Sequence, residues 1–416
     1  MANPTHSHDL VRKRTCDAYM WTKILNTPFW AIYNLLPYIF YKDLHATPLQ
    51  ITVIFIMKPA VSIIAMYWSA WVEKRKDRLL PNLIWARLLS HLPFFLFPFV
   101  DNPWFFIVCS GFYMMLTVGS VPAWMEVLKL NVAGGTRERV YAYGSAFGYA
   151  GAAVIPWALG TIMDNYVESW RWMFPITATI SLIAIFFKSR ILIIHDEEVP
   201  QKQPMSSISI KEQLIRPWKN AWGLMKRRPD FARYQWAFTL GGAGLSVMQP
   251  ALPVFFMDQL SLTYAELAIA IALCKGIGFA IASPSWAQLI NKVNIYRFNG
   301  LAGILMCLFP LFLIAAQIEL VWLYVGYLLY GVMQAGNEMS WNLSGPIFSK
   351  NEDSSIYTSV NVLTVGLRGC FVPAIGTLLL YVMQAGGVML MGAILCLLST
   401  GFMMFYSRSP LPDKAT

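Results

Sequence analysis

Twelve long apolar stretches run through this chain of 416 residues, and they decide its class. An α-helix needs roughly 20 mostly apolar residues to cross the hydrocarbon core of a bilayer. The stretches begin near Ala18, Pro48, Leu80, Pro103, Arg139, Ser169, Phe231, Leu262, Ile295, Leu320, Ser355 and Gly387. We therefore expect an all-α membrane protein with twelve transmembrane helices in two pseudo-symmetric six-helix bundles, residues 1–190 and 231–416.

Composition and charge agree with a membrane class. The chain is 57% hydrophobic and only 13% charged, against roughly 25% charged for a soluble domain. Its net charge of +10 does not indicate nucleic-acid binding, because most of the 32 Lys and Arg residues fall in alternate loops. Lys42 and Arg171 are the exceptions in the other loops. Cytoplasmic loops collect such residues, so we expect both termini to be cytoplasmic, in an inner or plasma membrane.

Residues 191–230 form the one extended polar segment and are interpreted as a cytoplasmic linker between the halves. Its second part carries Leu214, Trp218, Trp222 and Met225 at helical spacing, with Lys and Arg between them. This pattern predicts an amphipathic helix on the membrane surface, although a simple tether fits as well. Asp230 would cap the helix that follows. The turns at 42–47, 258–261 and 383–386 are then expected to face outward.

The two halves repeat each other at an offset of 216 to 217 residues. "LPYIFYKDLHATPLQI" matches "LPVFFMDQLSLTYAEL" in the second half. Further pairs follow at an offset of 217: Lys58 with Lys275, Trp124 with Trp341, and Pro156 with Pro373. A register that persists over four separate spans indicates an internal duplication and two similar bundles.

At this point the chain resembles the major facilitator superfamily over nearly its whole length. The signature of that family reads Gly-x-x-x-Asp-Arg-x-Gly-Arg-Arg and lies between helices 2 and 3. The matching stretch here is "SAWVEKRKDR". Ser69 and Lys76 replace the glycines, Glu73 stands for the Asp, Lys74 for the Arg, and Asp77 with Arg78 for the final basic pair. The resemblance implies alternating access around a central cavity and a conformational role for Ser69, Glu73, Lys74, Asp77 and Arg78.

Ionisable residues inside spans are costly and usually functional. The candidates for substrate binding or coupling are Lys58, Lys275, Arg368, Glu338, Glu126, Asn337, Trp341, Trp124, Asn34 and Gln249. Alternative roles stay open. Glu126 could simply pair with Lys129, Arg87 could snorkel or join a charge network with Glu73, and Asn34, Gln249 and Asn361 could hold helices together. Glu338 could neutralise a basic residue or titrate as the coupling group.

The pattern favours a transporter and no enzyme. No H-E-x-x-H, nucleophile elbow or phosphate loop occurs, and the six cysteines contain no C-x-x-C, so we expect no cofactor and no metal. Counting Arg87 and Lys129, five basic and two acidic residues lie in spans, which favours a small anionic metabolite. The alternatives are a proton-coupled carrier or efflux pump for neutral or cationic compounds, and a non-transporting receptor or scaffold. Expected partners are the solute, a proton or other coupling ion, and the bilayer around a monomer.

Overall fold

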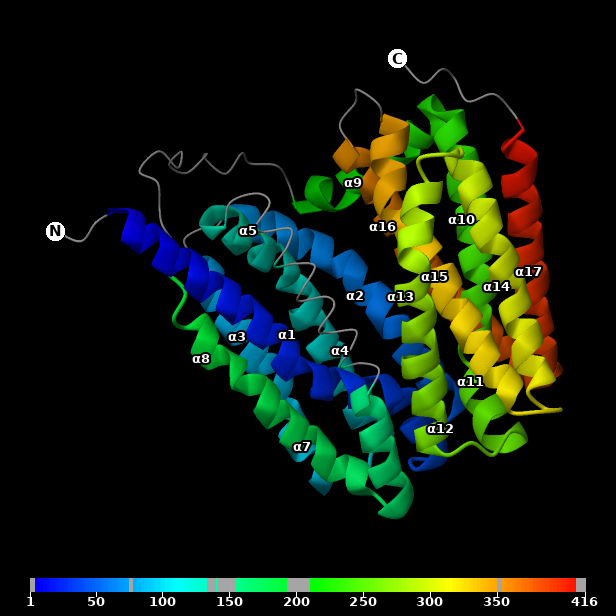
Figure 1. The fold of residues 1–416 in the computed structure, drawn as a ribbon, viewed down its shortest axis with the longest axis horizontal. Helices are drawn as coiled ribbons and strands as arrows, with labels where there is room; N and C mark the ends of the chain where they lie inside the picture. Colours follow the sequence, from blue (N-terminus) through cyan, green and yellow to red (C-terminus); the bar gives the residue numbers. More distant parts are fainter. Residues whose placement is uncertain are drawn as a thin grey trace. The chain divides into compact units, whose positions relative to one another are not determined.

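The computed structural model describes residues 4–74, 78–132, 140, 151, 154–192, 210–349 and 354–408, which are predominantly helical (Figure 1). The first part of the chain contains α1 (Pro4–Lys42), α2 (Pro48–Lys74), α3 (Leu79–His91), η2 (Leu92–Phe99), α4 (Pro103–Gly119), α5 (Val121–Asn131), α7 (Ser169–Leu182) and α8 (Ala184–Lys188). The second part contains α9 (Ile210–Arg227), α10 (Pro229–Met248), α11 (Ala251–Val254), η3 (Phe255–Gln259), α12 (Tyr264–Ala268), η4 (Ile269–Cys274), α13 (Lys275–Leu289), α14 (Ile295–Ala315), α15 (Val321–Ser349), α16 (Ser354–Val382) and α17 (Ala385–Tyr406).

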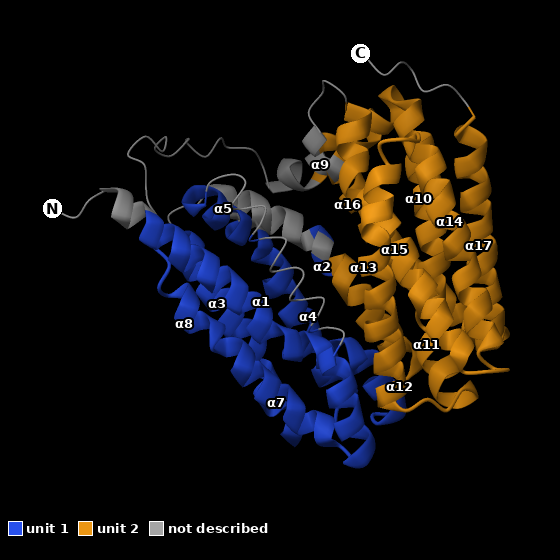
Figure 2. Ribbon diagram, in the orientation of Figure 1, with its two compact units in different colours: residues 1–44, 61–208 blue, residues 45–60, 209–416 orange. Residues whose placement is uncertain are grey.

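The chain divides into two compact units (Figure 2). Unit 1 comprises residues 1–44 and 61–208, and unit 2 comprises residues 45–60 and 209–416. The first half of α2 therefore packs within unit 2. There the Thr52 hydroxyl is hydrogen-bonded to that of Thr377 on α16, and Pro59 lies against Gly369, whose lack of a side chain leaves room for it. This contact places Lys58 in the same unit as Lys275.

Each unit has its own core. In unit 1, rings of Phe29, Phe94 and Phe174 are fully buried and contact one another. In unit 2, Phe231 and Tyr357 are buried and their rings meet edge to face. Aromatic pairs of this geometry contribute beyond their buried area.

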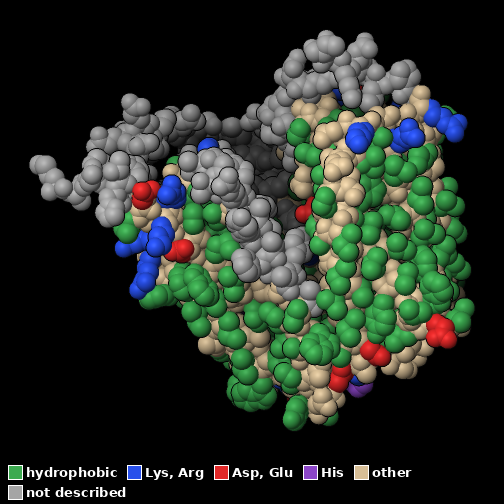
Figure 3. All heavy atoms as spheres, viewed as in Figure 1, with side chains coloured by type: hydrophobic (Ala, Val, Ile, Leu, Met, Phe, Trp, Pro, Cys, Tyr) green, Lys and Arg blue, Asp and Glu red, His purple; other side chains and the backbone are tan. Residues whose placement is uncertain are grey.

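Apolar side chains also cover the outside, as a bilayer requires. Ile281 is 72% exposed and Phe405 is 66% exposed, and hydrophobic side chains cover most of the described face of unit 2 in Figure 3. Among the described residues, seven helices are long and apolar enough to span a membrane, and α10 together with the helix formed by α11 and η3, bent against it, would be an eighth. α1 and α15 have the length of a span but are more polar, whereas in α2 the apolar segment within the described residues is Pro48–Val61. The span expected from Arg139 begins outside the described residues.

The starts of α2 and α12 repeat each other in detail. His45 and Ser261 both have a positive φ, 46° and 50°. Two residues later, Thr47 and Thr263 begin their helices, and each is bridged to a side chain three residues on. The Thr47 amide donates to Gln50 at 2.8 Å, and the Thr263 amide donates to Glu266 at 2.9 Å. Such reciprocal capping fixes a helix start, so both halves enter their second span in the same way.

A buried polar clamp joins three helices of unit 2. Asn361 on α16 accepts a hydrogen bond from Gln235 on α10 and donates to Ser344 on α15 at 2.8 Å. Thr364 donates to the other end of Gln235 at 3.2 Å. Asn361 therefore joins helices, as one of the sequence-based alternatives predicted, because hydrogen bonds between polar side chains tie helices together in an apolar bundle.

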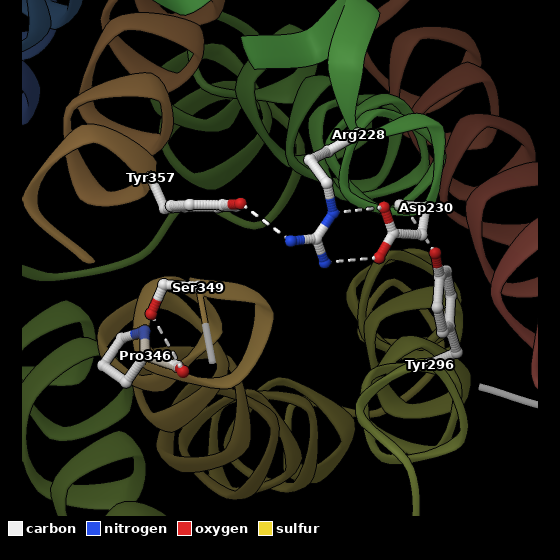
Figure 4. A network of polar contacts seen from close by, with 6 residues as sticks. All are labelled: Arg228, Asp230, Tyr296, Pro346, Ser349 and Tyr357. Carbon is white, nitrogen blue, oxygen red and sulfur yellow. Dashed lines mark hydrogen bonds and ion pairs between the residues drawn. The ribbon is translucent and has the colours of Figure 1, made fainter. Parts of the chain in front are cut away.

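A second polar network lies where α10 begins (Figure 4). Arg228 pairs with Asp230 at 2.9 Å and donates to the Tyr357 hydroxyl at 2.9 Å, while the Tyr296 hydroxyl donates to the Asp230 carbonyl at 2.5 Å. Asp230 is not the cap that the sequence predicted. It lies in the first turn of α10, after Pro229, and its carboxylate neutralises Arg228 instead.

Arg171, one of the two basic residues in the loops expected to face outward, is neutralised locally. Its guanidinium lies 2.6 Å from Asp101 and 3.3 Å from Glu168. It also donates to the Val100 carbonyl at 2.8 Å. The exception to the charge asymmetry is therefore a paired structural residue and does not weaken the expected topology.

Candidate functional site

Three basic residues predicted from the sequence belong to unit 2 and lie on different helices: Lys58 on α2, Lys275 on α13 and Arg368 on α16. Lys58 is exposed and Lys275 is half-buried. The positive charge of Lys58 acts on Lys275. Among the described residues, neither Lys275 nor Arg368 has an acidic ion-pair partner. Like charges placed together within a low-dielectric span repel each other, so this arrangement favours an anion.

The backbone of α13 is held close to α15 at Lys275. A side chain at Gly331 would place its first carbon 2.0 Å from the Lys275 carbonyl oxygen, so only glycine permits this approach. The π-helical turn η4 (Ile269–Cys274) ends immediately before Lys275. Such turns occur frequently at functional sites. Lys275 is thus positioned by a rigid helix contact on one side and a special turn on the other.

Arg368 lies across α10. Its guanidinium donates to the Phe238 carbonyl at 3.3 Å and stands 5.9 Å from the centre of the Phe238 ring. A side chain at Gly242 would clash with that guanidinium, since its first carbon would lie 1.8 Å from a terminal nitrogen. The Arg368 Nε is buried and has no partner among the described residues. The residue therefore keeps unused hydrogen-bonding capacity.

Glu338, Asn337 and Trp341 lie together on α15. Glu338 is exposed, and no described residue forms an ion pair with it, so the expectation that it neutralises one of the basic residues is not met. Asn337 is half-buried and contacts the Met333 sulfur at 2.9 Å. Trp341 is half-buried, and its ring centre lies 6.3 Å from that of Phe238. Phe238 thus adjoins both Trp341 and Arg368.

Two other predicted positions stand apart from these contacts. Gln249 is half-buried just after α10, and Asn34 is exposed on α1 in unit 1. Within the described part of the chain, neither side chain forms a hydrogen bond to another helix. Their predicted roles stay predictions.

In unit 1, Trp124 and Glu126 lie on α5. Trp124 is buried at 8% exposure and its ring meets that of Tyr19 edge to face at 5.5 Å. Glu126 is half-buried and Lys129 is exposed. Among the described residues, Lys129 has no acidic ion-pair partner, so the alternative that it pairs with Glu126 is not met. Trp124 carries the more informative contact, since the Lys188 ammonium lies 5.4 Å from the centre of its ring.

Sequence reasoning missed a second group of cations in unit 1. Lys188 was not among the candidates from the sequence, yet it is buried at 3% exposure. Arg87 does not snorkel. It is 8% exposed and donates to Asn26 at 2.7 Å. Lys188 is a basic residue at the end of an apolar span, and this pattern is typical of a cytoplasmic helix end. Its burial is therefore revealed only by the tertiary packing.

The conformational motif lies mostly outside the described residues. Asp77 is not described, and the side chains of Ser69, Glu73 and Lys74 are likewise outside the part of the chain that the structure describes. Arg78 is described and exposed, just ahead of α3. The role expected for these five residues stays a prediction.

Comparisons with known proteins agree with this architecture. The family model described as "Major Facilitator Superfamily" matches residues 24–373. Among solved structures, the nucleoside transporter NupG is similar with a TM-score of 0.69 and 14% identity, over 95% of this chain and 100% of that one. A bacterial homologue of the human lysosomal transporter Spinster, in an inward-facing and unoccupied conformation, gives 0.66 and 11% over 97% and 99%.

An auto-inhibited peptide transporter of the POT family gives a TM-score of 0.68 and 13% identity over 97% of this chain and 98% of the other. At these identities the likeness shows the fold alone. No protein with a curated description matches the sequence. The family match covers most of the chain and agrees with the apolar helices described above, so this protein belongs to the major facilitator superfamily and is a multi-pass secondary transporter of small solutes.

Proposed function

We propose that the transported solute is a small anion, such as a carboxylate or a phosphorylated metabolite, and that Lys58, Lys275 and Arg368 bind it. The observation that carries this proposal is the placement of Lys58 on α2 and Lys275 on α13 in the same unit, where the charge of Lys58 acts on Lys275. The two lysines come from different helices, and their like charges repel each other. An anion between them would turn that repulsion into attraction.

The surroundings of these cations support the same assignment. Arg368 retains a buried Nε without a partner among the described residues, and its planar guanidinium suits the two oxygens of a carboxylate or phosphate. The favourable interaction of these cations with an anion is gained only while the solute is bound. The two halves would then change access around the occupied site, as in other transporters with repeated bundles.

A thermal-shift screen of the purified full chain tests the solute class. Anionic, neutral and cationic metabolites are compared at constant ionic strength, because a ligand that binds the folded state raises the melting temperature by mass action. We expect stabilisation by anions alone, followed by uptake of the same compound in proteoliposomes. Stabilisation confined to neutral or cationic compounds would reject the anion assignment.

Glu338 favours a second function, proton coupling. It is a carboxylate inside a span, with no ion-pair partner among the described residues, on the same helix as Asn337 and Trp341. Under proton coupling, Glu338→Gln should abolish uphill uptake driven by a pH gradient while leaving solute exchange intact, since a neutral amide cannot carry the proton. Proteoliposome uptake with and without the gradient measures both. A variant that still concentrates solute would exclude Glu338, and Glu126 would be tested next.

The proposed orientation places both termini and the 191–230 linker in the cytoplasm. In unit 2, Lys292 and Arg297 flank the connection of α13 to α14, whereas Glu319 lies at the connection of α14 to α15, at the other end of α14. Figure 3 shows the same separation of basic from acidic side chains on the visible face of unit 2. Cytoplasmic ends collect Lys and Arg.

Single-cysteine labelling of intact cells measures this topology, in a background without the six native cysteines. We expect an impermeant maleimide to label a cysteine at Gln384, in the turn before α17, and to spare one at Ser207 in the linker. Permeabilised cells provide the control, because both positions should then react. Labelling of the linker position in intact cells would reverse the orientation.

A further inference from the structure

A pocket of about 140 Å³ lies inside unit 1, between α1, α3, α4, α5 and α8. Its polar lining includes Lys23 and Asn26 on α1, Arg87 on α3 and Lys188 at the end of α8, with Trp124 on α5 forming part of the wall. A volume of this size has room for roughly ten water molecules. It therefore suits a small polar group rather than a drug-sized molecule.

The pocket concentrates positive charge. The Arg87 charge acts on both Lys23 and Lys188, and among the described residues that line the pocket none is acidic. Arg87 is 8% exposed and Lys188 is 3% exposed, so water screens them poorly. Buried charges are normally paired, because the effective free-energy penalty of removing an ion from water is on the order of several kcal/mol. Here two buried cations are held next to each other instead.

Neutral contacts satisfy these cations only in part. Arg87 donates to the Asn26 amide oxygen at 2.7 Å and to the Thr22 carbonyl at 3.4 Å, and its Nε is buried with no partner among the described residues. Lys188 donates to the Leu83 carbonyl at 3.3 Å and lies over the Trp124 ring. Both groups have more N–H donors than these acceptors use. The unused donors are therefore available for a ligand.

Asn26 orients the guanidinium. Its side-chain oxygen accepts from Arg87 and also from the Ser181 hydroxyl on α7 at 2.9 Å. Since that oxygen is held by two donors, the guanidinium it contacts is fixed in place and faces the pocket with Lys188. A preorganised cation of this kind binds an anion without first losing side-chain freedom.

We propose that this unit 1 pocket is a binding site for an oxyanion, the carboxylate or phosphate group of a small solute or of a lipid headgroup. Arg87 is the oriented, forked donor, and Lys188 and Lys23 complete the positive lining. The proposal goes beyond the function proposed above, because it uses residues of unit 1 alone and shares none with Lys58, Lys275 and Arg368.

Lys188→Met is the test variant, because methionine keeps much of the side-chain length and removes the charge. The probes are inorganic phosphate and acetate, added to the purified full chain against chloride at constant ionic strength. We expect both probes to raise the melting temperature of the unaltered protein. In the variant, the protein without probe should melt higher, since repulsion with Arg87 is gone, while the apparent affinity for phosphate falls at least about tenfold.

Lys129→Met is the matched control, since Lys129 is an exposed lysine on α5 outside the pocket. It should respond to phosphate as the unaltered protein does. A structural lysine would behave differently. Lys188→Met would then melt lower, through loss of the Leu83 and Trp124 contacts, and the phosphate response would be unchanged. That result would overturn the proposal.

Nanodiscs separate the two sources of the oxyanion. If a headgroup is the ligand, phosphatidylglycerol should stabilise the unaltered protein relative to phosphatidylcholine, and Lys188→Met should lose that difference. If a free solute is the ligand, phosphate should act equally in both lipids. A protein that responds to neither phosphate, acetate nor phosphatidylglycerol in a Lys188-dependent way has no oxyanion site here. The loss of phosphate response caused by Lys188→Met should be equally large in a Lys275→Gln background, because the two proposed sites share no residue.

Discussion

Replacing Lys275 with glutamine is expected to weaken binding of the anionic solute by about thirtyfold to several thousandfold, which corresponds to about 2–5 kcal/mol for a charge partner left unpaired. Lys275 is half-buried on α13, and the Lys58 charge acts on it. Removing one of two repelling cations should leave the solute-free protein as stable as before or more so. Solute titration by thermal shift, with uptake into proteoliposomes, measures both quantities.

Lys292→Gln is the matched control for this experiment, because Lys292 is an exposed lysine at the connection between α13 and α14. It changes the net charge by the same amount and should leave affinity unaltered. If Lys275→Gln instead lowers the melting temperature and monodispersity while each folded molecule still transports normally, Lys275 is a structural residue.

The second large effect is expected at Gly331. An alanine there would bring its side-chain carbon 2.0 Å from the carbonyl oxygen of Lys275 and 2.8 Å from its carbonyl carbon. Since these are backbone atoms, no side-chain rotation can relieve the clash, and α13 must move away from α15. Overpacking of this kind costs about 1–3 kcal/mol and sometimes more. We expect a lower melting temperature together with weaker solute binding, because the displaced segment carries Lys275.

Gly401→Ala provides the comparison. Gly401 lies in α17, and a side chain there would meet no atom within 4 Å. Alanine stabilises an exposed helix interior by about 1 kcal/mol relative to glycine, so this variant should melt at the same temperature or higher. Equal behaviour of the two variants would show that the contact between α13 and α15 is not close in solution.

Much of the fold could be predicted because a bilayer imposes simple rules. Span length follows from membrane thickness, and the matching register of Lys58 with Lys275 indicates the duplication from the amino-acid sequence alone. The linker helix also lies where the spacing predicts it, as α9 (Ile210–Arg227). Its packing differs in detail: Leu224 is buried whereas Trp222 is 60% exposed. Periodicity identifies an amphipathic helix but not which of its apolar residues meets the bundle.

The candidate site was predicted less completely, for reasons that particular residues make clear. Lys58, Lys275 and Arg368 were recognisable because each interrupts a long apolar run. A charged side chain inside a span is costly in free energy unless it faces the protein interior or a water-filled cavity. Lys188 closes its run and so looks like an ordinary helix end. Its burial depends on Leu83 and Trp124, which are far away in sequence. The polar role of Asn26 likewise arises from packing, because Arg87 and Ser181 reach it from other helices.

The π-helical turn before Lys275 records a change in chain length since the halves diverged. The capping residues of the first half, Thr47 and Gln50, lie 216 positions before their equivalents in the second half, Thr263 and Glu266. Lys58, in contrast, lies 217 positions before Lys275. One extra residue therefore lies between Glu266 and Lys275, and Ile269–Cys274 occupies that interval. In a regular α-helix one added residue rotates everything after it by about 100°. The wider turn absorbs that residue, so the insertion could be tolerated without turning the Lys275 amine away from the direction that Lys58 takes in the first half.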